Sequence, residues 1–188
     1  PGGQTMNPST QELLQAIDKL SQQQVIVLPN NDNVVLAAEK AKELAGKQVV
    51  VVPSETIPQG ISALLAFNYQ ADLSKNTEAM TKALSSIETA EITRAIRSVR
   101  INGLQVEEGE IIGLLNGDLT ASGPTIREVA LQLLEQMNAD QREIITAYYG
   151  EDVTEGEAQD LVNDLRERYP DQEWELVDGG QPHYHYIL

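Results

Sequence analysis

The sequence predicts an α/β protein in two parts, and three observations carry that prediction. First, two short all-apolar runs are each followed by a helix pattern, which is typical of parallel strands with crossover helices. Second, Asn-Gly pairs at 102–103 and 116–117 indicate hairpins, so later strands should be antiparallel. Third, aromatic residues make up only 4% of the chain, so a Val, Ile, Leu and Ala core is expected. We therefore predict a parallel-sheet α/β lobe over 1–90 and a smaller α+β lobe over 91–188.

The first lobe alternates strand and helix patterns. The runs QVIVLP and QVVVVP are apolar and end at proline, so each reads as a buried strand. A helix before them begins with Ser9 and Glu12 at capping-box spacing, and Asn33 is the expected cap of the helix between them. The expected strands are Gln24–Pro29 and Gln48–Pro53, and the expected helices are Ser9–Leu20, Asn33–Ala45, Ile61–Phe67 and Asn76–Ile87.

The second lobe has shorter strands and two amphipathic helices. Thr125 or Ser122 is the expected cap of the first helix, and Thr154 with Glu157 forms a capping box for the second. We expect the strands to be antiparallel, with both helices on one face. The expected strands are Glu91–Val99, Leu104–Glu107, Glu110–Leu115, Glu143–Tyr149, Glu173–Val177 and Tyr184–Leu188, and the helices are Ile126–Met137 and Thr154–Tyr169.

Composition excludes several classes of protein. The chain has no cysteine, so it can form neither a disulfide nor a thiolate metal site, and it has no Cys nucleophile. No apolar run approaches the roughly 20 residues that cross a bilayer, and no signal-peptide pattern is present. We expect a cytoplasmic protein with no membrane span. Because the sequence begins with Pro1-Gly2-Gly3, we also expect it to be a piece of a longer protein.

The charge of the chain is strongly and unevenly negative. The net charge is −16; residues 1–90 hold nine acids and six lysines, whereas residues 91–188 hold twenty acids and seven arginines. Such a surface repels phosphate backbones and anionic membranes, so nucleic acid is not an expected partner. One interpretation is a solubilising surface, and the other is electrostatic steering of a basic partner face by the second lobe.

The sequence lacks the common catalytic signatures. It has no GxxxxGK[ST] or GxGxxG loop, no HExxH, no EF-hand and no GxSxG elbow. The two histidines, His183 and His185, would point to the same face of a strand, but two ligands do not complete a tetrahedral metal site. We expect neither a metal site nor a catalytic residue in this chain.

Uncharged polar side chains gather where an α/β sheet places a ligand. Ligands of such sheets bind beyond the carboxyl ends of the strands, and helix N-termini there favour an anion. The same residue types are also the preferred helix caps, so an anion site and simple capping both remain open. The candidate ligand-binding residues are Thr5, Asn7, Ser9, Asn30, Asn31, Asn33, Ser54 and Thr56.

Several ordered segments carry a family resemblance. GGQTMNPST at 2–10 closely resembles a signature in the C-terminal domain of bacterial fatty acid kinase, the dihydroxyacetone-kinase-like protein of that system. The resemblance continues through four further segments and covers essentially the whole chain. These segments are Asn30–Asn33 after VIVLP, Val51–Gln59, Tyr148–Asp152 and Asp178–Tyr184.

That resemblance implies a DegV-like fold, with a Rossmann-like lobe and a smaller α+β lobe. It implies that ATP and magnesium bind an N-terminal domain that is not in this chain, and that a strand and helix precede Gly2. It also implies that the partner is a separate DegV-like fatty-acid-binding protein, which presents its acyl carboxylate for phosphorylation. The segment 5–9 looks like the Thr-Ser-Gln-Pro-Ser loop of DegV proteins, but it has Met6 and Asn7 in place of Ser and Gln. A thioether cannot donate the hydrogen bond of a hydroxyl, which weakens a carboxylate site.

The leading hypothesis is a non-catalytic domain that docks the fatty-acid-binding protein. The alternative is a small-molecule module that binds a fatty acid or another anion at the candidate residues. An autonomous enzyme is disfavoured because no nucleophile–base pair or metal constellation is visible. The docking surface stays unassigned, and a homodimer is left open.

Overall fold

The computed structural model describes residues 7–101 and 103–188, and the contacts within the chain divide it into two compact units. The first unit is Pro1–Ile87 and the second is Glu88–Leu188. The sequence placed this division near residue 90, at the start of the first strand of the second unit. Each unit has its own hydrophobic clusters.

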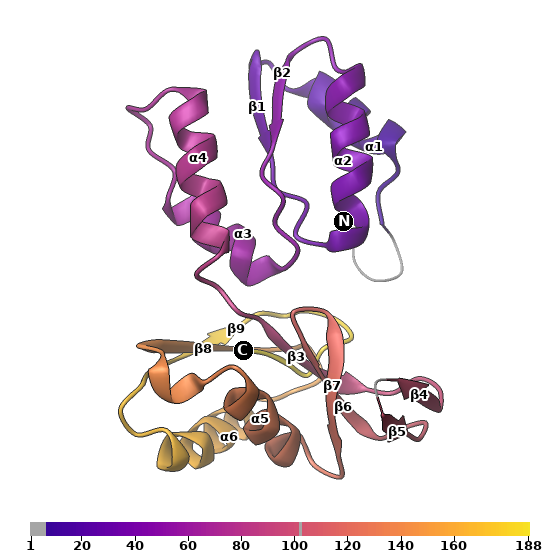
Figure 1. The fold of residues 1–188 in the computed structure, drawn as a ribbon, viewed down its shortest axis with the longest axis vertical. Helices are drawn as coiled ribbons and strands as arrows, with labels where there is room; N and C mark the ends of the chain where they lie inside the picture. The colour runs from indigo at the N-terminus through magenta and orange to yellow at the C-terminus, as the bar shows by residue number, and fades with distance from the viewer. Residues whose placement is uncertain (1–6, 102) are drawn as a thin grey trace. The chain divides into compact units, whose positions relative to one another are not determined.

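The first unit is a parallel pair of strands between two layers of helices (Figure 1). Strands β1 and β2 pair in register from Gln24 opposite Gln48 to Val27 opposite Val51. On one face, Val25 and Val49 pack with Ile17 and Ala41 of α1 and α2. On the other face, α3 and α4 form a second cluster around Val52, Ala63, Met80 and Leu84. The elements are α1 (Thr10–Lys19), β1 (Gln24–Val27), α2 (Asp32–Leu44), β2 (Gln48–Val51), α3 (Ile57–Leu65) and α4 (Leu73–Leu84).

The predicted elements of this unit are all present, but three helices begin earlier than expected. Helix α4 spans Leu73–Leu84 and not Asn76–Ile87, because Asp72 caps it by accepting the Lys75 N–H. Asn31, and not Asn33, caps α2, because Asn31 is extended and its side chain accepts the Asn33 N–H. Helix α3 begins at Ile57, not Ile61, because Thr56 caps it and Pro58 fits the first turn. A first-turn N–H has no partner within the helix, so proline costs nothing there.

The second unit is a six-stranded mixed sheet with α5 and α6 packed on it. Its strand order is β7-β6-β3-β10-β8-β9, and a separate hairpin, β4–β5, lies beside it. The elements are β3 (Ala90–Arg94), β4 (Val99–Ile101), β5 (Leu104–Val106), β6 (Ile111–Leu115), β7 (Asp118–Gly123), α5 (Ile126–Gln136), a 3₁₀ turn (Ala139–Gln141), β8 (Ile144–Tyr149), α6 (Glu155–Arg168), β9 (Glu173–Asp178) and β10 (Tyr186–Ile187).

Three features of this sheet differ from the expectation. Strand β9 runs parallel to β8, since α6 crosses between them, so the lobe is not purely antiparallel. The segment predicted as Glu91–Val99 is two strands, β3 and β4, separated by a bend at 95–98. Strand β7 was not predicted: its sequence DLTASG has one large apolar residue, and its pairing with β6 specifies it.

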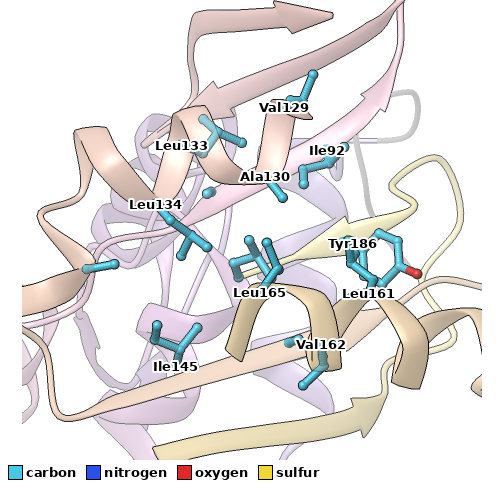
Figure 2. Packing of buried hydrophobic residues seen from close by; sticks show 14 of the residues in the cluster. Ile92, Val129, Ala130, Leu133, Leu134, Ile145, Leu161, Val162, Leu165 and Tyr186 are labelled. Carbon is cyan, nitrogen blue, oxygen red and sulfur yellow. The ribbon is translucent and has the colours of Figure 1, made fainter. Parts of the chain in front are cut away.

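The core of the second unit lies between the sheet and the two helices (Figure 2). Leu133 and Leu134 of α5 and Leu165 of α6 are fully buried there, together with Ile92 of β3. Tyr186 of β10 lies in the same cluster, so the shortest strand of the sheet is also a core element. Among the described residues, no helix has both the length and the apolar composition needed to span a bilayer.

Candidate functional site

The carboxyl ends of β1 and β2 bring two of the predicted site residues into direct contact. The fully buried Ser54 hydroxyl donates to Asn30 Oδ1 at 2.7 Å, and it accepts the Asn30 backbone N–H at 3.1 Å. Asn30 has a φ of 54°, a left-handed conformation that asparagine tolerates better than most residues. These paired hydrogen bonds join the loop after β1 to the loop after β2, and we call them the Asn30–Ser54 lock.

The first turns of α3 close over this lock. A Cβ atom built on Gly60 would lie 2.1 Å from Asn30 Oδ1, so only glycine lets the helix approach this closely. Gly60 is buried, and its N–H donates to the Thr56 carbonyl in an ordinary helical bond at 3.1 Å. The Asn30 side chain is therefore held between a hydroxyl and a helix backbone, which fixes its orientation.

Three other predicted residues cap helices in the structure. Asn31 Oδ1 accepts the Asn33 N–H at 3.0 Å, and the Thr56 hydroxyl accepts the Gln59 N–H at 3.3 Å. The Ser9 hydroxyl accepts the Glu12 N–H at 3.3 Å within a complete capping box. The capping interpretation therefore accounts for the side-chain oxygens of Ser9, Asn31 and Thr56.

The remaining candidates do not converge on the lock. Asn33 is exposed on α2 and contributes its backbone N–H to the cap, while Asn7 is exposed before α1. Thr5 lies outside the described residues. A ligand role for these eight residues stays a prediction, because the contacts of the seven described ones assign none to them.

The candidate residues carry no formal charge that could attract an anion to this end of the sheet. Only the backbone dipoles of the nearby helices could do so. All eight are uncharged, so an anion would depend on the free N–H groups of helix N-termini. At α1 that position already holds a carboxylate. Hydrogen bonds from the Ser9 backbone and then its hydroxyl hold the pKa of Glu12 below its usual range. A second anion there would meet like-charge repulsion.

A cavity of about 500 Å³ lies in the first unit beside β1, and sequence reasoning missed it. Apolar side chains such as Ile26, Leu28, Phe67 and Met80 line it, while polar atoms form about half of its surface. Its buried amide, Asn76, is satisfied by the chain itself: its Nδ2 donates to the Asn68 carbonyl at 2.9 Å, and its Oδ1 accepts the Asn68 N–H at 2.7 Å. The feature of the sequence that could have indicated this cavity is the stretch 57–71, which holds no charged residue.

The two histidines do not share a strand face. Strand β10 begins at Tyr186, and His183 lies before it in a left-handed conformation with a φ of 73°. His185 is held instead by Asp152, with 2.5 Å between Nδ1 and Oδ2, while its buried Nε2 has no hydrogen-bond partner. Within 7–101 and 103–188, no group of three His, Cys, Asp or Glu side chains is placed to hold a metal ion.

Comparison with known families accounts for the whole chain. The family of FakA-like C-terminal domains, from fatty acid kinase, matches residues 1–188. The chain belongs to this family. A curated relative, Protein YloV from Bacillus subtilis (strain 168), is 38% identical over 187 residues. An uncharacterized protein from Staphylococcus aureus (strain MRSA252) is 35% identical over 187 residues. Each alignment covers 100% of this chain and 34% of the relative, so the chain spans about a third of their length.

Solved structures confirm the DegV-like fold of this FakA-like C-terminal domain. A DegV family protein from Corynebacterium glutamicum matches with a TM-score of 0.68 at 18% identity, covering 96% of this chain and 81% of that one. The fatty acid kinase B3 protein of Streptococcus pneumoniae, solved with linoleic acid, matches with a TM-score of 0.65 at 11% identity, covering 96% and 75%. At these identities the likeness establishes the fold alone.

Proposed function

We propose that this chain is the non-catalytic C-terminal domain of a fatty acid kinase, and that it docks a DegV-like fatty-acid-binding protein. The observation that carries the proposal is the family match over residues 1–188. Docking would place the partner's acyl carboxylate within reach of a kinase domain outside this chain. The proposed partner would have the same fold as this domain, as the kinase B3 structure illustrates.

The proposal assigns the phosphoryl-transfer chemistry, with its ATP and magnesium, to the part of the protein that lies outside these 188 residues. Two observations support that assignment. The chain spans 34% of its curated relatives, so most of their length is available for a catalytic domain. Among the described residues at the strand ends, Asn30 and Ser54 are engaged in the Asn30–Ser54 lock, and Asn31 and Thr56 in helix caps.

Calorimetric titration of this chain with the acyl-loaded fatty-acid-binding protein tests the docking function. We expect saturable binding at low salt and no ATP turnover by the chain alone. Absence of binding at low salt contradicts docking, whereas ATP turnover by the isolated chain contradicts the assignment of chemistry to another domain.

The cavity beside β1 favours a second candidate function, binding of a small ligand with both apolar and polar parts, such as a fatty acid. Its volume, about 500 Å³, falls within the range of ordinary ligand pockets. Mass spectrometry of molecules extracted from the purified chain distinguishes the two candidates. A stoichiometric fatty acid favours the binding module, and an empty extract favours docking alone.

A further inference from the structure

The parallel pair β1–β2 is a small sheet for the helices that cover it. In the described part of the first unit, two strands of four residues each lie between helices on both faces (Figure 1). Parallel sheets are normally buried on both faces, and a sheet of only two strands is marginally stable alone. Among the described residues, β1 and β2 therefore each keep one edge that no other strand covers.

The direction of the backbone groups at these two edges follows from the hydrogen bonds between the strands. The Val52 N–H donates to the Val27 carbonyl at 3.0 Å, so both residues direct these groups into the sheet. Successive residues of a parallel strand alternate in this respect. Ile26 therefore directs its N–H and C=O away from β2, and Val51 directs its own away from β1. A further strand could pair with either edge.

The edge of β1 adjoins the cavity of about 500 Å³. Ile26 and Leu28 of β1 line this cavity together with Phe67, which follows α3. None of its lining residues is charged, and one of them, Leu64, is a large apolar residue that is 60% exposed. In a chain with a net charge of −16, an uncharged surface with exposed apolar side chains indicates that another segment covers it.

The edge of β2 adjoins a groove of a different character. This groove has a volume of about 700 Å³, and Val50 of β2 lines it together with residues of α4. Two of these residues, Glu78 and Lys82, are charged and exposed. Charged side chains at the edge of a sheet oppose the addition of another strand. The uncharged edge of β1 is therefore the one suited to pairing.

The polar groups of the cavity beside β1 favour a strand over a small ligand. Asn76 Nδ2 donates to the Asn68 and Ala71 carbonyls at 2.9 and 3.2 Å, and Asn76 Oδ1 accepts the Asn68 N–H. Gln24 Nε2 donates to Gln48 Oε1 at 2.9 Å. These side chains are thus engaged within the chain, while the backbone groups at the edge of β1 still need partners. A peptide backbone matches the spacing of those groups, whereas an acyl chain cannot pair with them.

The relatives contain enough chain to supply a further strand. This chain covers 34% of Protein YloV, so most of that protein lies outside the matched part. The matched DegV family protein from Corynebacterium glutamicum is covered over 81% of its length, and the kinase B3 protein over 75%. Each of these structures therefore holds residues beyond the part of the fold that this chain supplies.

We propose that the edge of β1 and the cavity beside it form a slot for a further β-strand, and that an apolar, extended segment of the same protein, from outside these 188 residues, fills it. The strand would lie about 4.8 Å from β1, with its alternate side chains in the cavity. This inference goes beyond the docking function and does not depend on it. It does bear on the second candidate function, because a filled slot excludes an acyl chain from this cavity.

Hydrogen exchange at single amides, measured in the full-length protein and in this chain alone, tests the slot. The Ile26 N–H should exchange about 100-fold more slowly in the full-length protein, because the added strand accepts its hydrogen bond. The Val51 N–H at the edge of β2 is the matched control, and its rate should change by less than about threefold. Equal rates for Ile26 in the two proteins would show that the slot stays open, and would overturn the proposal.

Two substitutions on the same face of the sheet add a second measurement. Ile26 and Val50 are register partners, so Ile26→Thr places a hydroxyl in the slot and Val50→Thr places one in the groove beside β2. Ile26→Thr should lower the thermal midpoint of this domain by about 3 °C more in the full-length protein than in the chain alone, because only there is the hydroxyl buried. Val50→Thr should have the same effect in both proteins. A shift for Ile26→Thr that is equal in both proteins contradicts the slot.

Three other results would each overturn the proposed occupant. Protection of the Ile26 N–H that appears only when the acyl-loaded fatty-acid-binding protein is added would assign the slot to that partner. Sedimentation of the chain alone as a dimer that Ile26→Thr dissociates would assign it to a second copy. A stoichiometric fatty acid in extracts of the full-length protein, lost in Ile26→Thr, would assign it to a ligand. Docking is measured separately by calorimetric titration, so the docking function and this inference can fail independently.

Discussion

Ser54 connects the ends of β1 and β2 through a single hydroxyl, which both donates to and accepts from Asn30. Ser54→Ala leaves the part-buried N–H and amide oxygen of Asn30 without this partner. We expect the free energy of unfolding to fall by about 1–3 kcal/mol, measured by urea titration. Ser85→Ala, which removes an exposed hydroxyl at the end of α4, is the control and should change it by less than about 0.5 kcal/mol. Equal effects of the two substitutions would show that the lock does not stabilise the fold.

A second prediction concerns Gly60, which packs against Asn30 of the same lock. Alanine normally stabilises a helix relative to glycine, but a Cβ on Gly60 would meet Asn30 Oδ1 at 2.1 Å. Gly60→Ala should therefore lower the thermal midpoint, because the lock must open to admit the methyl group. Gly156→Ala in α6, where a Cβ would meet nothing within 4 Å, should leave the midpoint unchanged or raise it.

The sequence showed which polar residues follow the strands of the first unit. It did not show whether they bind an anion or cap helices. Ser9 and Thr56 precede helices, so capping followed from local propensity, and the structure confirms the Ser9 cap. The contact between Asn30 and Ser54 could not be predicted in the same way, because it joins residues 24 positions apart. The approach of Gly60 was equally hidden, since it depends on how α3 packs over the loop after β1.

For the N-cap of helix α5, the sequence left two candidates, Thr125 and Ser122. In the structure the Thr125 hydroxyl accepts the Glu128 N–H at 3.2 Å, while Ser122 lies within β7. Thr125→Ala should cost about 1 kcal/mol of unfolding free energy, and Thr125→Ser should restore most of it. Ser122→Ala is the matched control at the rejected position. A larger loss for Ser122→Ala than for Thr125→Ala would contradict this assignment of the cap.

Helices were easier to predict than strand pairing for a physical reason. A helix is specified by contacts three or four residues apart, so apolar period and cap residues suffice to find α5 and α6. Strand direction depends on partners that are distant in the chain. The parallel pairing of β8 with β9 therefore escaped a prediction drawn from nearby turns, and so did β7, whose partner specifies it.

The stability of the second unit at high pH should depend on Tyr186. Burial, and then the nearby charges of Glu157 and Asp152, raise the pKa of Tyr186 to about 12. An unfolded tyrosine ionises near pH 10, so the fold favours the neutral form. The stability that this group contributes is complete below pH 10 and is lost as the pH rises through about 12.

Tyr186→Phe should therefore reduce the loss of stability between pH 10 and 12, because phenylalanine cannot ionise. Thermal midpoints of both proteins across that range measure the effect. Tyr69→Phe, at a side chain that is 94% exposed, is the control and should leave the alkaline loss as it is in the parent chain. If the thermal midpoints of the parent and of Tyr186→Phe fell equally over this range, ionisation of Tyr186 would not be the cause of the alkaline loss of stability.

The position of β10 sets an order of events during synthesis. This two-residue strand pairs with β3 on one side and β8 on the other, so among the described strands it joins the group β7-β6-β3 to the pair β8-β9. It follows all of these strands in the chain, and a ribosome therefore releases both groups before the strand that joins them. Until then, each group leaves an edge open to other nascent chains.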